Sequence, residues 1–129
     1  MDRIPGLFIA HIESKGRGVF TAVEINKGDL IEVCPVIVIP KAELQIIHKT
    51  CLHDYYFLWG KNLDQCAIAL GYGSIYNHAV SANANFILDL VNNTIDIECI
   101  KNIGPGEEIL LNYHGEDGNR DKLWFEIVK

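Results

Sequence analysis

A polar, glycine-rich segment near the middle of the chain most constrains how the chain can fold. Residues Gly71–Asn85 separate two apolar runs, Cys66–Leu70 and Phe86–Val91. Glycine is entropically costly inside helices and strands, and Asn and Ser side chains compete for backbone hydrogen bonds. The segment therefore predicts an irregular stretch between two core strands, with backbone groups bonded outside a regular ladder. It is either an ordinary surface loop or a ligand-binding segment that holds Asn77 and His78 inward.

Length and composition predict one globular domain, residues 1–129. The chain is 49% hydrophobic and 22% charged, which excludes the disordered class. A chain of this length buries roughly two-thirds of its unfolded surface and needs no metal or disulfide to form a core. Apolar runs such as Val36–Ile39 are far shorter than the ~20 residues of a membrane helix, so no membrane partner is expected. Met1–Gly6 lacks the layout of a signal peptide, which predicts a cytoplasmic protein.

Charge and cysteine spacing narrow the classes of partner. The formal net charge of −6 argues against direct nucleic-acid binding and is compatible with a basic, lysine-bearing protein. The four cysteines form no C-x-x-C pair and no zinc-ribbon spacing. His48, Cys51 and His53 lie close together in sequence, but without a second clustered pair they are better read as a reduced thiol and surface imidazoles. No metal is expected.

Alternation of apolar and polar residues predicts a mostly β protein. About ten short strands are expected, among them residues 7–12, 19–23, 30–33, 36–39, 54–59, 66–70, 85–90 and 95–99. Pro35 predicts an edge or a bend, and Asn92-Asn93 predicts a two-residue hairpin turn. Short helices are expected over Lys41–His48, with Leu44, Ile47 and His48 on one face, and over 120–127. Such spacing favours several small sheets folded around one another, without a nucleotide-binding strand–helix alternation.

Three stations rich in glycine or polar residues lie far apart in the chain. They are Gly16-Arg17-Gly18, Asn77-His78, and the run Gly106–Tyr113. Each has an ordinary structural reading, as a turn, a satisfied core histidine and a strand that ends in a core or rim tyrosine. Their joint presence, in this order on an all-β chain, points to one shared site.

These stations resemble the motifs of the SET-domain protein lysine methyltransferases, from about residue 15 to residue 124. Lys-Gly-Arg-Gly-Val-Phe20 is similar to the family's Gly-x-Gly motif, Asn77-His-Ala-Val-Ser-Ala-Asn83 to its Asn-His-Ser-x-x-Pro-Asn motif, and Gly106-Glu-Glu-Ile leading to Tyr113 to its third motif. The chain is most like minimal viral and bacterial members without zinc-binding flanks. The resemblance implies a SET-type β-clip with a C-terminal pseudoknot, in which the C-terminal segment passes beneath the loop around the Asn-His motif, a rare topology.

The resemblance implies S-adenosylmethionine as cofactor and S-adenosylhomocysteine as product. It assigns cofactor binding to seven residues from three places in the chain: Gly16, Arg17, Gly18, Tyr76, Asn77, His78 and Trp124. The glycine pair would bring backbone to the amino-acid end of the cofactor, and the Asn-His pair would hold its adenine and amino group. Trp124 would either cover the adenine or pack the terminal helix.

The resemblance makes Tyr113 the catalytic residue and places Tyr55 in the substrate lysine channel, with Tyr56 as the alternative if the register slips by one. A phenol with a reference pKa near 10 stays protonated at neutral pH, so Tyr113 would orient and polarise rather than act as a strong base. Aromatic walls would lower the pKa of the substrate lysine. Ala79 and Ala82 depart from the family's Ser and Pro, which predicts a looser loop.

The expected function is methyl transfer to the ε-amine of a lysine in a protein, with histones as candidate substrates. Two alternatives stay open: a non-catalytic SET-like module that binds cofactor or methyl-lysine, and a β-rich structural domain with a core histidine. A homodimer that completes the substrate groove is compatible with the resemblance. Action on chromatin would place the protein in a host nucleus rather than the cytoplasm.

Overall fold

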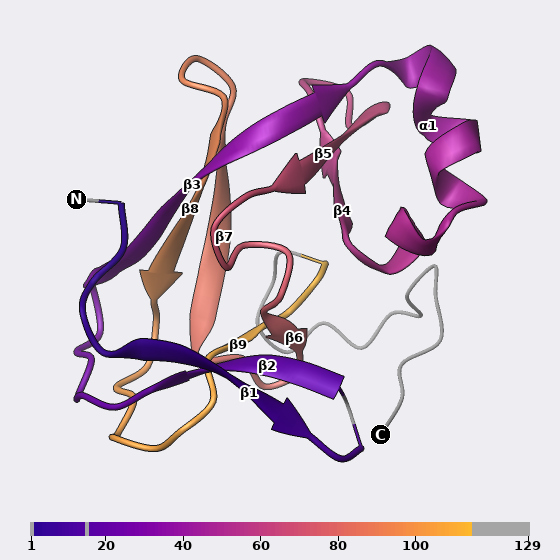
Figure 1. Cartoon of the computed structure of the whole chain (residues 1–129). Coiled ribbons are helices and arrows are strands. Elements are labelled where there is room, and N and C mark those ends of the chain that lie inside the picture. The colour runs from indigo at the N-terminus through magenta and orange to yellow at the C-terminus, as the bar shows by residue number, and fades with distance from the viewer. Residues whose placement is uncertain (1, 15, 115–129) are drawn as a thin grey trace.

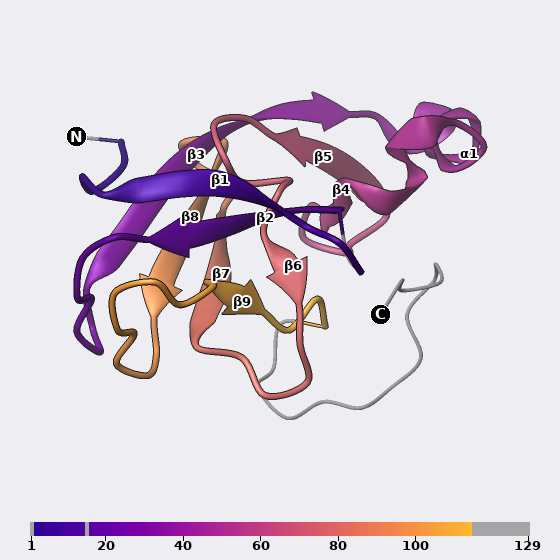
Figure 2. The same cartoon turned by 60° about the horizontal axis from the view of Figure 1, so that its bottom comes forward.

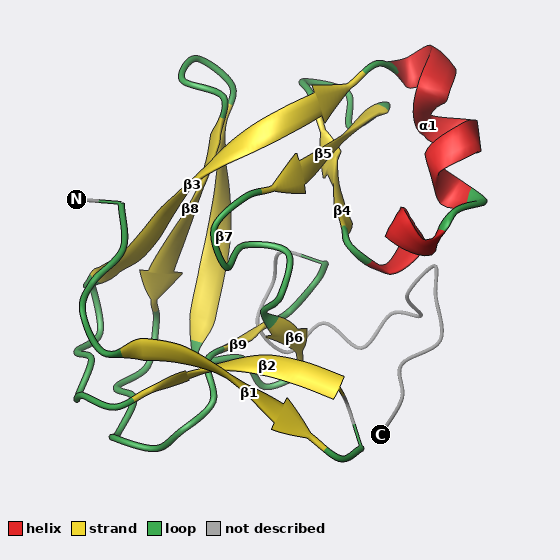
Figure 3. Ribbon diagram, in the orientation of Figure 1, coloured by secondary structure: helices red, strands yellow, loops and turns green. Residues whose placement is uncertain are grey.

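The computed structural model describes residues 2–14 and 16–114. Within these residues the chain forms nine strands, an α-helix and a short 3-10 helix (Figure 3). Their bounds are β1 Leu7–Ile12, β2 Gly16–Thr21, β3 Leu30–Ile39, α1 Lys41–His48, η1 Cys51–Asp54, β4 Tyr56–Trp59, β5 Gln65–Ala69, β6 Asn77–His78, β7 Ala84–Asp89, β8 Thr94–Cys99 and β9 Leu110–Leu111. The prediction of a mostly β chain is confirmed. The predicted helix over 120–127, and Trp124 within it, lie outside the described residues.

The strands form a two-stranded sheet and a curled seven-stranded sheet. The first pairs β1 with β2, and the second has the order β4-β5-β3-β8-β7-β9-β6. Helix α1 lies at the β4–β5 end of the large sheet, and the β1–β2 pair crosses its β6–β9 end (Figure 1). The two views of the molecule agree on this arrangement (Figure 2). The segments that carry the three predicted motifs therefore all lie at one end of the molecule.

Strand β3 is continuous through Pro35, so the predicted break into two strands is wrong. Residues Leu30–Pro35 pair with β8, and Val36–Ile39 pair with β5, which places β3 inside the sheet rather than at its edge. Pro35 sits where the strand changes partner, and its carbonyl accepts a hydrogen bond from the N–H of Leu70 at 2.9 Å. Proline is tolerated there because its missing N–H falls at the junction of the two ladders.

The hairpin β7–β8 has the predicted strands but a longer turn. Asp89 pairs with Thr94, so residues 90–93 form the connection and the two-residue turn is wrong. The carboxylate of Asp89 accepts hydrogen bonds from the N–H groups of Val91 and Asn92, at 3.1 and 3.0 Å. Asn93 adopts φ 54°, the left-handed conformation that asparagine tolerates.

Helix α1 has the predicted bounds and the predicted apolar face. Leu44 and Ile47 pack against a small cluster formed by Ile39, Tyr56 and Cys66. This contact joins the helix to β4 and β5. The 3-10 helix η1 that follows it was not predicted, and it leads the chain directly into the aromatic segment that begins at Tyr55.

The run that contains the third motif lies along β2. The N–H of Ile109 donates to the carbonyl of Val19 at 2.8 Å, and the N–H of Thr21 donates to the carbonyl of Glu107 at 3.1 Å. Ile25 and Ile103 exchange two backbone hydrogen bonds of 2.9 Å each. These bonds bring residues 103–109 beside the first motif, although more than 80 residues separate the two in sequence.

Strand β9 is inserted between β6 and β7, the two strands that the loop 79–83 connects. It pairs in parallel with both, through Asn77–Leu110, His78–Leu111 and Ala84–Leu111. The chain therefore passes beneath that loop, as the predicted pseudoknot requires, and residues beyond 114 lie outside the description. The loop is tied down despite its two alanines, because Ala79 donates to the Leu111 carbonyl at 2.9 Å.

Asn83 closes the loop over β9. Its side-chain amide donates to the carbonyl of Glu108 at 2.9 Å and accepts from the N–H of Leu110 at 2.8 Å. We expect Asn83→Ala to lower the free energy of unfolding by about 2–4 kcal/mol, because two backbone groups lose their partner. Urea denaturation checks this, with Asn92→Ala in the exposed hairpin loop as the matched control at about 1 kcal/mol or less. Equal losses for both variants would contradict a special role for Asn83.

Two kinds of feature are absent from residues 2–14 and 16–114. No helix in this part of the chain is long and apolar enough to cross a membrane. In the same residues, no group of three or more His, Cys, Asp or Glu side chains is placed to hold a metal ion.

Candidate active site

The three predicted stations meet at the side chain of Asn77. Its amide nitrogen donates to the carbonyl of Arg17 at 3.0 Å and to the carboxylate of Glu108 at 2.7 Å. One side chain from β6 thus joins β2 to the run that leads into β9. The structure confirms that these distant segments converge, and it shows that the primary amide of asparagine, with two N–H donors, is suited to the position.

Gly16 and Gly18, the two glycines of the first motif, have different surroundings. A β-carbon on Gly18 would lie 2.5 Å from Oε2 of Glu108 and 2.8 Å from Nδ2 of Asn77, so the backbone there packs directly on polar side chains. A β-carbon on Gly16 would meet nothing within 4 Å, and Gly16 has φ +80°. The start of β2 therefore presents its backbone to open space, next to the exposed Arg17.

Tyr76 has its side chain in the core rather than in a cofactor site. The ring is 1% exposed, and its hydroxyl donates to Oε1 of Glu32 at 2.7 Å. What Tyr76 offers to the site is its main-chain carbonyl, which accepts a hydrogen bond from the hydroxyl of Tyr113. The predicted contribution of Tyr76 to cofactor binding is thus limited to its main chain.

Tyr113 is held at both ends by the 76–78 segment. Its hydroxyl donates to the Tyr76 carbonyl, and its N–H donates to Nδ1 of His78 at 2.9 Å. Because Nδ1 accepts, the proton of the neutral His78 ring lies on Nε2. Burial, with a smaller contribution from the Glu108 carboxylate, raises the pKa of the Tyr113 phenol well above its ordinary value. Tyr113 is therefore a fixed, protonated hydrogen-bonding group.

A cavity of about 280 Å³ opens beside Tyr113. Most of its wall is aromatic or aliphatic, with a single carboxylate, one serine and one histidine among the lining residues. The lining residues are Asp54, Tyr55, Tyr56, Phe57, Leu58, Leu63, Ser74, Phe86, Leu88, Tyr113 and His114. A mostly apolar cavity lined in part by a hydrogen-bonded phenol suits a long aliphatic side chain with a polar tip.

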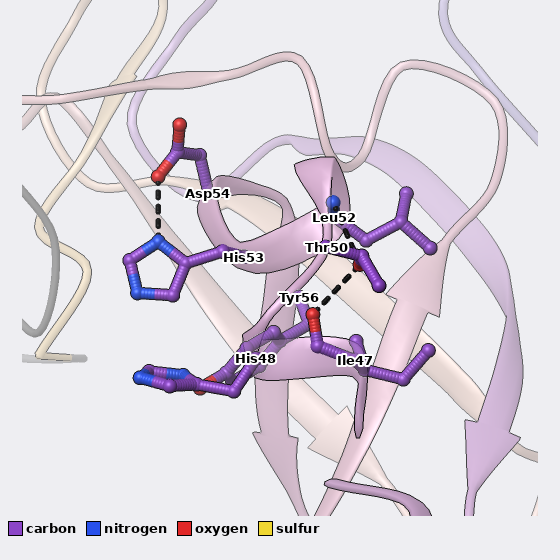
Figure 4. Close-up of polar contacts among 7 residues, drawn as sticks. All are labelled: Ile47, His48, Thr50, Leu52, His53, Asp54 and Tyr56. Atoms are coloured by element: carbon purple, nitrogen blue, oxygen red, sulfur yellow. Dashed lines mark hydrogen bonds and ion pairs between the residues drawn. The ribbon is translucent and has the colours of Figure 1, made fainter. Parts of the chain in front are cut away.

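Both tyrosines proposed for the channel line this cavity, but their hydroxyls differ in surroundings. The Tyr56 hydroxyl lies 2.8 Å from Nδ1 of His48, on the side of α1 (Figure 4). Tyr55 is 40% exposed, and its phenol is near enough to Tyr113 to help raise the pKa of that residue. Tyr55 therefore offers an exposed side chain to the cavity, whereas the Tyr56 hydroxyl is engaged by His48.

His48 and His53, which were considered as possible metal ligands, contact other side chains. His53 lies 3.0 Å from the carboxylate of Asp54 through Nδ1, and its ring packs edge-on against His48 with centroids 4.3 Å apart (Figure 4). The side chain of Asp54 is 57% exposed and belongs to the cavity wall. The His53 ring thus contacts a carboxylate that belongs to the cavity wall.

Sequence reasoning missed two carboxylates that organise the site. Glu108 was noted only as a letter of the third motif, and its contact with Asn77 depends on the pairing of β6 with β9. Glu32 was predicted only as one residue of the strand 30–33, yet it is 3% exposed and bonded to Tyr76. The sequence signal that could have indicated its burial was an acidic residue next to the apolar Ile31 inside a predicted strand. Trp124, the remaining predicted site residue, lies outside the described residues.

Comparisons with known proteins agree with this geometry. A family model for the SET domain matches residues 16–114. A Schizosaccharomyces pombe protein named histone-lysine N-methyltransferase, H3 lysine-37 specific, is 35% identical over 121 residues, covering 93% of this chain and 77% of that protein. A crystal structure from Plasmodium falciparum, described as a candidate histone methyltransferase, matches with a TM-score of 0.68 and 29% identity over 88% of this chain and 95% of that one.

A structure of ctPRC2 shares the fold. It matches with a TM-score of 0.69 and 20% identity, over 88% of this chain and 15% of that chain, and at this identity the likeness concerns the fold alone. The family model covers most of the chain and all three motifs, including Tyr113. Together with the fission yeast relative, it confirms the resemblance drawn from the motifs. This chain belongs to the SET domain family.

Proposed function

We propose that this chain is a protein lysine N-methyltransferase that uses S-adenosylmethionine. The observation that carries the proposal is the position of Tyr113. Its hydroxyl is fixed by the Tyr76 carbonyl at the inner wall of an aromatic cavity, one residue along the chain from the Asn77 amide that joins β2 to Glu108. A substrate cavity and a polar cofactor-binding region thus meet at one phenol.

The residues around Asn77 fit the amino-acid end of the proposed cofactor, which carries an ammonium and a carboxylate. The exposed Arg17 guanidinium is suited to the carboxylate, and the Glu108 carboxylate to the ammonium. The absence of a side chain at Gly16 leaves open space against the backbone of β2. Backbone groups of Asn77 and His78, on the edge strand β6, are proposed to hold the rest of the cofactor. When bound, the cofactor supplies an electrophilic sulfonium methyl group.

The chain's own residues align the acceptor and lower the cost of deprotonating it. A lysine with a pKa near 10.4 is neutral about once in a thousand at pH 7.4, a cost of roughly 4 kcal/mol. Enclosure by Tyr55, Phe57 and Phe86 disfavours the ammonium and lowers its pKa. The protonated Tyr113 hydroxyl contributes orientation and a fixed dipole beside the mostly apolar cavity wall.

The substrate is proposed to be a lysine-bearing protein, with histones as the first candidates. Support comes from the fission yeast relative, which is named for a histone lysine. The net charge of −6 and the exposed Asp54 carboxylate at the cavity favour a basic substrate segment. A homodimer that completes the substrate groove, and a cytoplasmic or host-nuclear location, remain part of this proposal.

A methyl-transfer assay tests the proposed function. We expect radiolabel from S-adenosylmethionine to reach core histones or proteins of a host lysate, and calorimetry to detect S-adenosylhomocysteine at micromolar concentrations. Cofactor binding without transfer to any substrate would favour the non-catalytic SET-like module. No binding and no transfer would leave only the structural domain.

A further inference from the structure

We propose that Glu32 is a positioning residue for the catalytic hydroxyl, acting through Tyr76. This inference rests on the proposed function and extends it to a carboxylate outside all three motifs. Glu32 is 3% exposed and lies on β3, while the substrate cavity is lined by other elements. Within the described part of the chain it is the charged side chain with the deepest burial. A buried carboxylate needs strong partners, because burial without them is costly.

The strand is shaped to turn Glu32 inward. The pairing of β3 with β8 shifts between Leu30 and Glu32, so that Leu30 faces Glu98 and Glu32 faces Ile97. A regular strand alternates its faces, but here the neighbours Ile31 and Glu32 are both buried. The irregularity is a β-bulge, a device that redirects a side chain. The backbone is therefore built to place this carboxylate inside the protein.

The carboxylate binds the segment that leads into β6. Its Oε1 accepts from the Tyr76 hydroxyl at 2.7 Å, and its Oε2 accepts from the Tyr72 N–H at 3.1 Å. Oε2 also lies 3.4 Å from the Arg3 guanidinium, which stacks 3.8 Å above the Tyr72 ring. Gly71, at φ +64°, gives the close approach, since a β-carbon there would collide with Oε2. Glu32 thus holds residues 71–76 at two points.

Tyr76 links this anchor to the reaction centre. Its side chain is bonded to Glu32, and its main-chain carbonyl accepts the hydrogen bond from the Tyr113 hydroxyl. The rigid, fully buried ring of Tyr76 connects the two bonds, so a movement of the Tyr76 hydroxyl would also move the Tyr76 carbonyl. A loss of the Glu32 bond would leave the 71–76 turn free to shift, and with it the acceptor that orients Tyr113. Misplacement of a reacting group by about 1 Å can cost a hundredfold in rate.

Single-turnover methyl transfer in two backgrounds tests the link. We expect Glu32→Gln, and independently Tyr76→Phe, to slow transfer about 10-fold in the wild-type background while S-adenosylhomocysteine affinity stays within about 2-fold. In the Tyr113→Phe background the same changes should slow transfer by less than about 2-fold, because the hydroxyl they position is gone. Ile95→Val in β8 is the matched control for lost stability, and it should act equally in both backgrounds.

Equal losses in both backgrounds, or no loss in either, would overturn the proposal and leave Glu32 a structural residue. A second readout does not need activity. In protein labelled at the tyrosine ring Cζ atoms, with five tyrosines to assign, Glu32→Gln should shift the NMR resonance of Tyr113 and Ile95→Val should not. An unshifted Tyr113 resonance overturns the positioning role. If the wild-type protein transfers no methyl group but Glu32→Gln still shifts the Tyr113 resonance, the proposed function is refuted and the link from Glu32 to Tyr113 is supported.

Discussion

Tyr113→Phe is expected to slow methyl transfer by about 100-fold or more while cofactor affinity stays within about 3-fold. The change removes one oxygen and keeps the ring, the cavity wall and the N–H that donates to His78. The hydrogen bond to the Tyr76 carbonyl disappears, and with it the fixed dipole beside the cavity. Single-turnover assays with radiolabelled cofactor, and calorimetry with S-adenosylhomocysteine, measure the two quantities separately.

The pH dependence of the wild-type rate tells how Tyr113 acts. Burial raises the pKa of its phenol, so the hydroxyl stays protonated between pH 7 and 9 and the rate should rise across this range with deprotonation of the substrate lysine. A rate that falls above pH 8, or a Tyr113→Phe enzyme as fast as the wild type, would contradict the role assigned to the hydroxyl.

Gly18→Ala is expected to weaken S-adenosylhomocysteine binding by about 10-fold or more. The added β-carbon would lie 2.5 Å from Oε2 of Glu108 and 2.8 Å from Nδ2 of Asn77, so the contacts that join β2, β6 and the third motif must separate. Overpacking of this kind costs about 1–3 kcal/mol. Calorimetry measures the affinity, and circular dichroism with thermal melting establishes that the variant is folded.

Gly104→Ala is the matched control for this prediction. A β-carbon there would come within 2.9 Å of Oε1 of Glu107, an exposed and flexible side chain that can move away. Its effect on S-adenosylhomocysteine binding should stay within about 2-fold, because side-chain relocation on the surface costs little. If Gly18→Ala bound the product as tightly as the control does, the close packing of β2 against Asn77 would have no bearing on the cofactor.

Local sequence patterns were sufficient to predict the elements whose structure is determined by neighbouring residues. Strand Leu7–Ile12 and helix Lys41–His48 have the predicted bounds, and the 85–90 and 95–99 runs form the predicted pair. Residue-by-residue alternation and helical spacing report burial on one face, which is a local property. The turn at Asn92-Asn93 was wrong because the side chain of Asp89 stabilises a longer loop.

Contacts between segments far apart in sequence determined the features that the periodicity of apolar residues does not encode. Pro35 lies inside a continuous strand because β3 changes partner from β8 to β5 there, and no local signal specifies two partners. The burial of Glu32 depends on a bulge opposite Ile97 and on donors that arrive from residues 72 and 76. Strand propensity predicted the strand but not the burial of this residue.

For the site, the sequence alone determined the three motifs, because these depend on residue type and order, and their resemblance to the SET family implied Tyr113 as the candidate catalytic group. The tertiary structure decided which atoms of those residues are available. It buried the Tyr76 ring, turned its carbonyl to Tyr113, and bonded the Tyr56 hydroxyl to His48 while Tyr55 stayed exposed at the cavity. The physical reason is the insertion of β9 between β6 and β7, a pairing of segments some 30 residues apart that no local preference encodes.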